Sequence, residues 1–165
     1  MTDNDWIIQY EQLKSWAESK NYTVTEKWGV EDCIVFEDQE IFINSRCKPE
    51  NMFYTLLHEC GHYLLDKAKE SFKETHPVYP SEVTDGRIEK STAYRVCILS
   101  EELKAWERGW RLAKRLNLHV DQQNYHRCMT DALWTYVIDV TKDIKTQVIT
   151  TDPNGSESDS SKGEV

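Results

Sequence analysis

The feature that constrains this chain most is a run of apolar residues with helical spacing between positions 51 and 65. The residues at that spacing are Met52, Phe53, Leu56, Leu57, Cys60, Leu64 and Leu65. Positions three and four apart share one face of an α-helix, so the run predicts a strongly periodic helix. Pro49 suits the first turn of such a helix, where its missing N–H leaves no hydrogen bond unmade. We expect the rest of the chain to be arranged around this helix.

The same helix carries His58-Glu59-Cys60-Gly61-His62, which matches the pattern H-E-x-x-H. His58 and His62 lie one turn apart on one face, so both imidazoles can reach one metal ion, with zinc as the first candidate. Glu59 is rotated by about a hundred degrees from His58, which places its carboxylate beside the metal as a base instead of as a ligand. The alternative is a plain core helix with two buried histidines, and the periodic context favours the metal site.

Composition bounds the class of protein. A chain of 165 residues with 39% apolar content suits one globular domain. The net charge of -9 argues against general binding to nucleic acid or to an anionic membrane. Five cysteines without a C-x-x-C pair indicate reduced thiols. Because no stretch is typical of a signal peptide or membrane span, we expect a cytoplasmic protein.

Short β-branched and aromatic runs precede the motif helix. A first helix is expected from about Asp5 to Lys20, with Asp3 or Asp5 as its N-cap. Three strands are expected after it, over residues 22–28, 33–36 and 41–43, with residues 37–40 as a hairpin loop. These strands predict a small N-terminal antiparallel sheet beside the motif helix.

Helical patterns dominate the rest of the chain. Residues 67–86 are expected to form a long loop at the edge of a cleft. Residues 87–117 read as one helix, or as two with Ser100 capping the second. The last helix opens near Asp121, and its apolar stripe is expected in the core: Tyr125, Cys128, Met129, Ala132, Leu133, Tyr136, Val137, Val140 and Ile144. The acidic tail, residues 150–165, is expected to be disordered. The fold class is therefore α+β, a mainly helical single domain.

A catalytic zinc ion commonly takes three protein ligands, so the motif needs one more donor. No histidine follows at the short spacing of the H-E-x-x-H-x-x-G-x-x-H class. The weaker candidates are His76, His119 and His126, and the stronger ones are Glu89, Glu101, Glu102 and Glu107. Glu102 is favoured because Ala105 and Gly109 follow on the same face, where small residues let two helices approach closely. Glu101 and Glu89 remain open as alternatives.

With Glu102-Leu103-Lys104-Ala105-Trp106 downstream of the motif, the chain resembles the small gluzincin-type zinc metallopeptidases, most closely the ImmA/IrrE-like and related phage or bacterial families. The resemblance covers roughly residues 34–116. It implies that residues 1–149 form a minimal zincin-like metallopeptidase domain. In that domain His58, His62 and Glu102 would bind Zn²⁺, and Glu59 would be the catalytic base. No DNA-binding domain is recognisable beside it.

The sequence thus predicts a zinc-dependent peptidase, with a protein or peptide as substrate and a narrow, regulatory specificity. Hydrolysis also needs a donor for the developing oxyanion, which Tyr63, Tyr94 or a loop histidine could supply. The alternative is a catalytically silent, zinc-stabilised interaction protein whose acidic surface and tail bind a host or regulatory partner. No membrane partner is expected.

Overall fold

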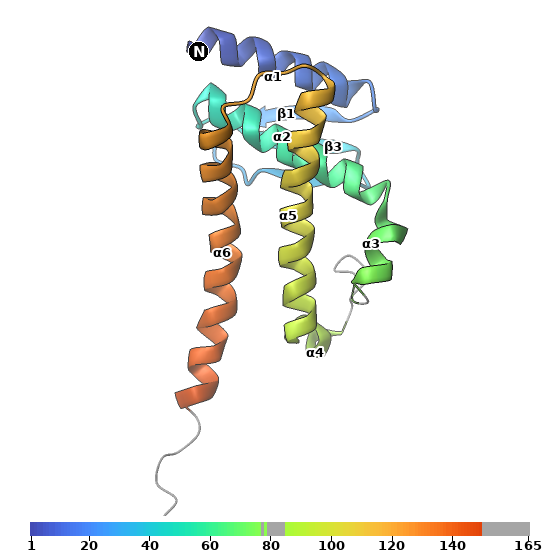
Figure 1. The fold of residues 1–165 in the computed structure, drawn as a ribbon, viewed down its shortest axis with the longest axis vertical. Helices are drawn as coiled ribbons and strands as arrows, with labels where there is room; N and C mark the ends of the chain where they lie inside the picture. Colours follow the sequence, from blue (N-terminus) through green and yellow to red (C-terminus); the bar gives the residue numbers. More distant parts are fainter. Residues whose placement is uncertain (77, 79–84, 150–165) are drawn as a thin grey trace, which may run out of the picture.

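The computed structural model describes residues 1–76, 78 and 85–149, with side chains up to residue 138 (Figure 1). The elements in chain order are α1 (Asp3–Glu18), β1 (Thr23–Lys27), β2 (Cys33–Val35), β3 (Glu40–Asn44), α2 (Pro49–Asp66), α3 (Lys69–Thr75), α4 (Gly86–Glu89), α5 (Thr92–Arg115) and α6 (Gln122–Ile149). The predicted class, a mainly helical α+β fold, is confirmed.

The sheet has the strand order β1-β3-β2 and is mixed. β2 pairs with β3 antiparallel, as the hairpin predicted, but β1 pairs with β3 parallel, in the register Val24 to Ile41. The prediction of a fully antiparallel sheet was therefore wrong. The reason is that β3 lies between the other two strands, so β1 pairs with β3 and not with β2. The alternation of side chains in a short strand does not encode which strand it pairs with.

α2 is the centre of the core. Its residues Phe53, Leu56, Leu57 and Cys60 have no exposed surface. α1 covers α2, and the Trp6 ring lies 5.7 Å from that of Phe53. α1 starts two residues earlier than predicted, because Thr2, and not Asp3 or Asp5, is its N-cap and forms a capping box with Asp5. Burial of these aromatic faces fixes α2 between α1 on one side and α5 on the other (Figure 1).

α2 and α5 cross with their backbones in contact. A Cβ atom added to Gly61 would overlap the Ala105 carbonyl group, and one added to Gly109 would meet the Leu57 carbonyl oxygen. Ala105 itself is fully buried. Two small residues on α5 and one on α2 thus allow an approach that larger side chains would block. Glu102, one turn before Ala105, is thereby brought over the motif face of α2.

Three predictions about the second half need correction. The segment 67–86 contains α3, so it is not simply a loop; residues 77 and 79–84 lie outside the described part of the chain. Ser100 is not an N-cap, because it lies inside α5, whose N-cap is Ser91.

The predicted start of the last helix near Asp121 is confirmed, since α6 begins at the next residue.

The apolar stripe of α6 is core only at its start. Tyr125 is 2% exposed, whereas the stripe residues from Cys128 to Val137 are only partly buried. Figure 1 shows the reason: α5 and α6 run side by side in opposite directions and extend past the sheet, so α6 has a neighbour on one side only. Val140 and Ile144, and the tail of residues 150–165, lie outside the described side chains. Within the described helices, none has the length and apolar character required to cross a membrane.

Candidate metal centre

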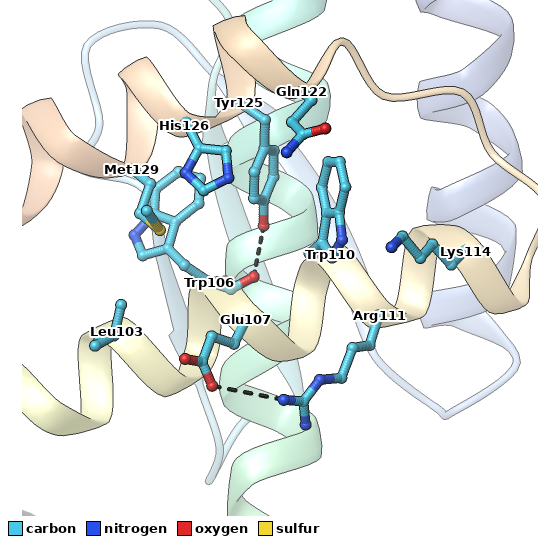
Figure 2. A pocket seen from close by; sticks show the side chains of 10 residues that line it. All are labelled: Leu103, Trp106, Glu107, Trp110, Arg111, Lys114, Gln122, Tyr125, His126 and Met129. Carbon is cyan, nitrogen blue, oxygen red and sulfur yellow. Dashed lines mark hydrogen bonds and ion pairs between the residues drawn. The ribbon is translucent and has the colours of Figure 1, made fainter.

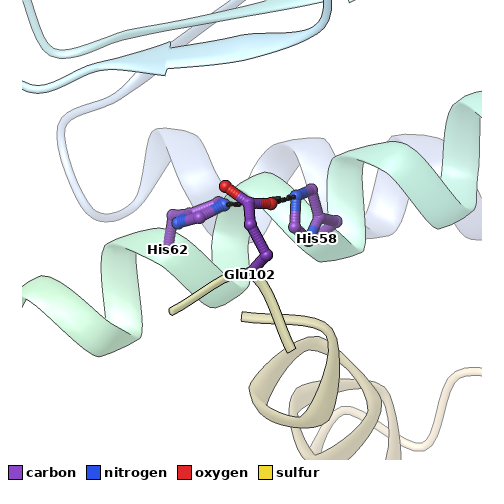
Figure 3. Close-up of side chains that lie close together, drawn as sticks. All are labelled: His58, His62 and Glu102. Atoms are coloured by element: carbon purple, nitrogen blue, oxygen red, sulfur yellow. Dashed lines mark hydrogen bonds and ion pairs between the residues drawn. The ribbon is translucent and has the colours of Figure 1, made fainter. Parts of the chain in front are cut away.

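Three side chains from two helices converge beside the sheet (Figure 3). His58 and His62 project from one face of α2, with their Nε2 atoms 3.1 Å apart. Glu102 reaches them from α5, and its Oε2 lies 3.2 Å from the His58 Nε2 and 3.5 Å from the His62 Nε2. The structure therefore brings together the three residues that the sequence singled out as ligands.

These separations fit a small metal ion. Zinc binds nitrogen and oxygen at about 2.1 Å, so two donors of a tetrahedral site lie about 3.4 Å apart. The three measured separations are close to that value. Two histidines and one carboxylate are also a donor set that catalytic zinc sites use, with the fourth position left to water. The group is the one His/Cys/Asp/Glu cluster with metal-binding geometry among the described residues.

The other candidates for the third ligand lie elsewhere. Glu101, next to Glu102 on α5, is half-buried and does not join the group, and Glu89 belongs to α4. His76 stacks on Phe72, with ring centroids 4.0 Å apart. His119 packs beside Trp6, and His126 lines a cavity on the other side of α5. Of the alternatives left open by the sequence, the geometry thus favours Glu102.

Burial and mutual contact set the protonation of the group. Burial opposes the charge on Glu102, but hydrogen bonds with both histidines outweigh it and hold the pKa of this carboxyl well below its usual range. Burial lowers the pKa of His58. Burial also acts to lower the pKa of His62. The hydrogen bond with Glu102 and the charges of nearby carboxylates outweigh burial, so the pKa of His62 is raised. An ionised carboxylate and a neutral His58 imidazole are the forms that bind a metal ion.

Glu59 lies beside the group without belonging to it. Its Oε1 is 4.0 Å from the His58 Nε2, and the residue is 4% exposed. Burial raises the pKa of its carboxyl to about 7, against the lowering effects of His62 and of a hydrogen bond with the Ile34 backbone. A carboxyl with a pKa close to neutrality suits proton transfer at neutral pH. The hydrogen bond also ties Glu59 to β2.

Two adjoining hollows, of about 400 Å³ and 280 Å³, open onto the group. Both are lined by His58, Glu59 and Glu102, together with Tyr136 of α6, and the smaller one also by β2. Ligands of the size of a few amino-acid residues can therefore reach the metal group from the space between β2, α2 and α6.

Tyr136 is the site residue that the sequence did not reveal. Its place in the apolar stripe of α6 predicted a core residue, and nothing local distinguishes it. Burial raises its pKa, and the charge of Glu102 and a hydrogen bond with that carboxylate raise it further. Tyr63, one of the predicted oxyanion donors, instead packs against Trp16 and Tyr22. Neither Tyr63 nor Tyr94 lines the hollows.

A third cavity, of about 500 Å³, lies between α5 and α6 on the other side of Trp106 (Figure 2). The Trp106 indole stacks on the His58 ring, with centroids 4.5 Å apart, and so forms the wall between this cavity and the metal group. The Tyr125 hydroxyl donates a 2.7 Å hydrogen bond to the Trp106 carbonyl and holds that part of α5. No residue of the metal group lines this cavity.

Comparison with known proteins gives no further assignment. No protein-family model, no curated protein and no solved structure matches this chain. The arrangement of His58, His62, Glu102 and Glu59 is therefore the observation on which a functional proposal rests.

Proposed function

We propose that this protein is a zinc-dependent metallopeptidase. The observation that carries the proposal is the meeting of His58, His62 and Glu102 at separations suited to zinc, with Glu59 beside them and a hollow in front. Zinc held there would supply a Lewis acid and a water molecule with a pKa lowered towards 7. A structural site has no use for a buried base at the position of Glu59, which favours the enzyme over a silent zinc protein.

The residues around the group have separable roles in this proposal. Glu59 accepts a proton from the attacking water and delivers it to the leaving amine nitrogen. The Tyr136 hydroxyl, which its raised pKa keeps protonated, would turn its one proton from Glu102 to the oxyanion that forms at the scissile carbonyl. In this proposal Tyr136 is the oxyanion donor, in place of Tyr63, Tyr94 or a loop histidine.

The shape of the site supports an extended peptide as substrate. β2 is an edge strand, and its residues Cys33 and Ile34 line the smaller hollow. An edge strand has unpaired N–H and C=O groups that can pair with an extended chain. A peptide added along β2 would pass directly in front of Glu59. The narrow, regulatory specificity expected from the sequence stays a prediction.

Zinc content tests the ligand set. We expect the purified chain to bind one zinc ion, and Glu102→Gln to weaken binding at least about 100-fold, since losing even an outer hydrogen-bond partner of a ligand costs about 10- to 100-fold. Glu101→Gln is the matched control, because it removes the neighbouring carboxylate from the same helix. Competition with a chromogenic zinc chelator measures both affinities. Equal affinities in the two variants would contradict the assignment of Glu102.

Peptide cleavage tests the function itself. The zinc-loaded protein should cleave members of a diverse peptide library, read by mass spectrometry, and a chelator should abolish the cleavage until zinc is restored. A library left intact by fully zinc-loaded protein would contradict the peptidase and would support the zinc-stabilised interaction protein.

A further inference from the structure

The two hollows at the metal group have an acidic lining. Besides Glu59 and Glu102, they are lined by Glu31 and Asp32 before β2 and by Asp131 on α6, and by no lysine or arginine. Glu31 and Asp131 are exposed, and Asp32 is half-buried. Within the described part of the chain, no ion pair joins one of these three to a lysine or arginine. Three carboxylates on two sides of the hollows therefore have no lysine or arginine partner among the described side chains.

A metal ion would not cancel this charge. The two positive charges of a zinc ion held there would be offset by Glu102, as a ligand, and by Glu59 in its ionised form. The charges of Glu31, Asp32 and Asp131 would then have no basic partner among the described side chains. Glu31 and Asp32 directly precede Cys33, which lines the smaller hollow, so these two carboxylates lie at its edge. Burial raises the pKa of the Cys33 thiol, and the charges of Glu59, Glu31 and Asp32 raise it further.

The acidic lining is local to this face of α5. The cavity on the far side of Trp106 carries Arg111 and Lys114 together with a single carboxylate, Glu107, which pairs with Arg111 at 3.8 Å (Figure 2). The net charge of the whole chain does not by itself place negative charge at one cavity and basic groups at the other. The charge at the metal group is thus a property of that site.

We infer that the site selects peptides with lysine or arginine side chains on either side of the scissile bond. This inference rests on the proposed function and adds a substrate class to it. A basic side chain on a peptide lying along β2 meets Glu31 and Asp32, and one pointing to α6 meets Asp131. Opposite charges on the two surfaces also speed encounter and repel acidic peptides. A basic side chain would have no cation of the lining to compete with.

Peptide binding tests the inference without relying on turnover. The probes are three fluorescent decapeptides that are identical except for four positions occupied by lysine, glutamine or glutamate. Binding to zinc-loaded full-length Glu59→Gln protein is measured by fluorescence anisotropy. We expect the lysine peptide to bind roughly 10-fold more tightly than the glutamine peptide, since each exposed charge pair contributes modestly, and the glutamate peptide to bind most weakly. Added salt should reduce the differences in affinity among the three peptides, because it screens exposed charges.

Single neutralisations locate the effect. In the same background, Glu31→Gln and Asp131→Asn should each reduce the preference for the lysine peptide about threefold, with zinc content unchanged. Glu11→Gln is the control, because it removes an exposed carboxylate from α1, away from the hollows. Both substituted positions at the hollow are exposed, so we expect the variants to fold normally.

The outcomes separate the inference from the proposed function. Equal binding of the three peptides, or tighter binding of the glutamate peptide, would overturn the inference. Zinc-dependent cleavage of a library would in that case still support the proposed peptidase. Failure of every peptide to bind, together with an intact library, would overturn both. A loss of preference in Glu11→Gln equal to that in Asp131→Asn would show a whole-molecule charge effect and would also overturn the inference.

Discussion

Replacing Glu59 by glutamine is expected to lower peptide turnover by about 10²- to 10⁴-fold, the range that general acid–base catalysis contributes. Glutamine has the shape of glutamate but cannot accept the proton of the attacking water. Because Glu59 does not belong to the metal group, zinc affinity should remain close to that of the unsubstituted protein. Removing a buried carboxyl also removes a desolvation cost, so the free energy of unfolding should not fall.

The measurement pairs initial rates on a cleaved peptide with zinc content and a urea denaturation curve. Glu101→Gln is a suitable control, since it makes the same chemical change at a carboxylate of α5 that lies outside the metal group. Turnover retained in zinc-loaded Glu59→Gln would remove Glu59 from the mechanism. Lost turnover together with lost zinc would instead make Glu59 a ligand, contrary to the observed geometry.

The metal group was predictable because local rules determine most of it. The helix period alone places His58 and His62 together. Glu102 required a tertiary argument, that small residues mark the face of a helix crossing, and Ala105 and Gly109 do lie at the contact between α2 and α5. Glu101 is the same residue type one position away. Only the helix crossing, which faces Glu102 towards α2, distinguishes Glu102 from Glu101 as a ligand.

What could not be predicted depends on how elements pack in space. β1 pairs with β3 instead of with β2, which makes that pair parallel, and no residue of a five-residue strand encodes which neighbour it takes. Tyr136 fits the apolar period of α6 as well as its neighbours do. Its hydroxyl matters only because α6 passes the metal group, and that placement follows from the packing of Tyr125 near the start of the helix.

The helix crossing makes Gly61 the position most sensitive to a single methyl group. In Gly61→Ala, the added Cβ would overlap the Ala105 carbonyl and lie 2.7 Å from its carbon atom, so α2 and α5 must move apart. We expect the free energy of unfolding to fall by about 3 kcal/mol, the upper part of the usual range for overpacking, because the contact is with backbone and no side chain can rotate away. Glu102 would move with α5, so zinc binding should weaken as well.

Helix propensity alone predicts the opposite change in the free energy of unfolding, so the measurement distinguishes the two effects. Alanine stabilises a helix interior by about 1 kcal/mol relative to glycine, so without the crossing Gly61→Ala would raise stability. Gly86→Ala is the matched control: a Cβ there meets nothing within 4 Å, and the change should be neutral or mildly stabilising. Urea denaturation and zinc titration of both variants measure the difference. Gly61→Ala with unchanged stability and zinc affinity would mean that α2 and α5 do not touch, and Glu102 would then lose the crossing that brings it to the two histidines.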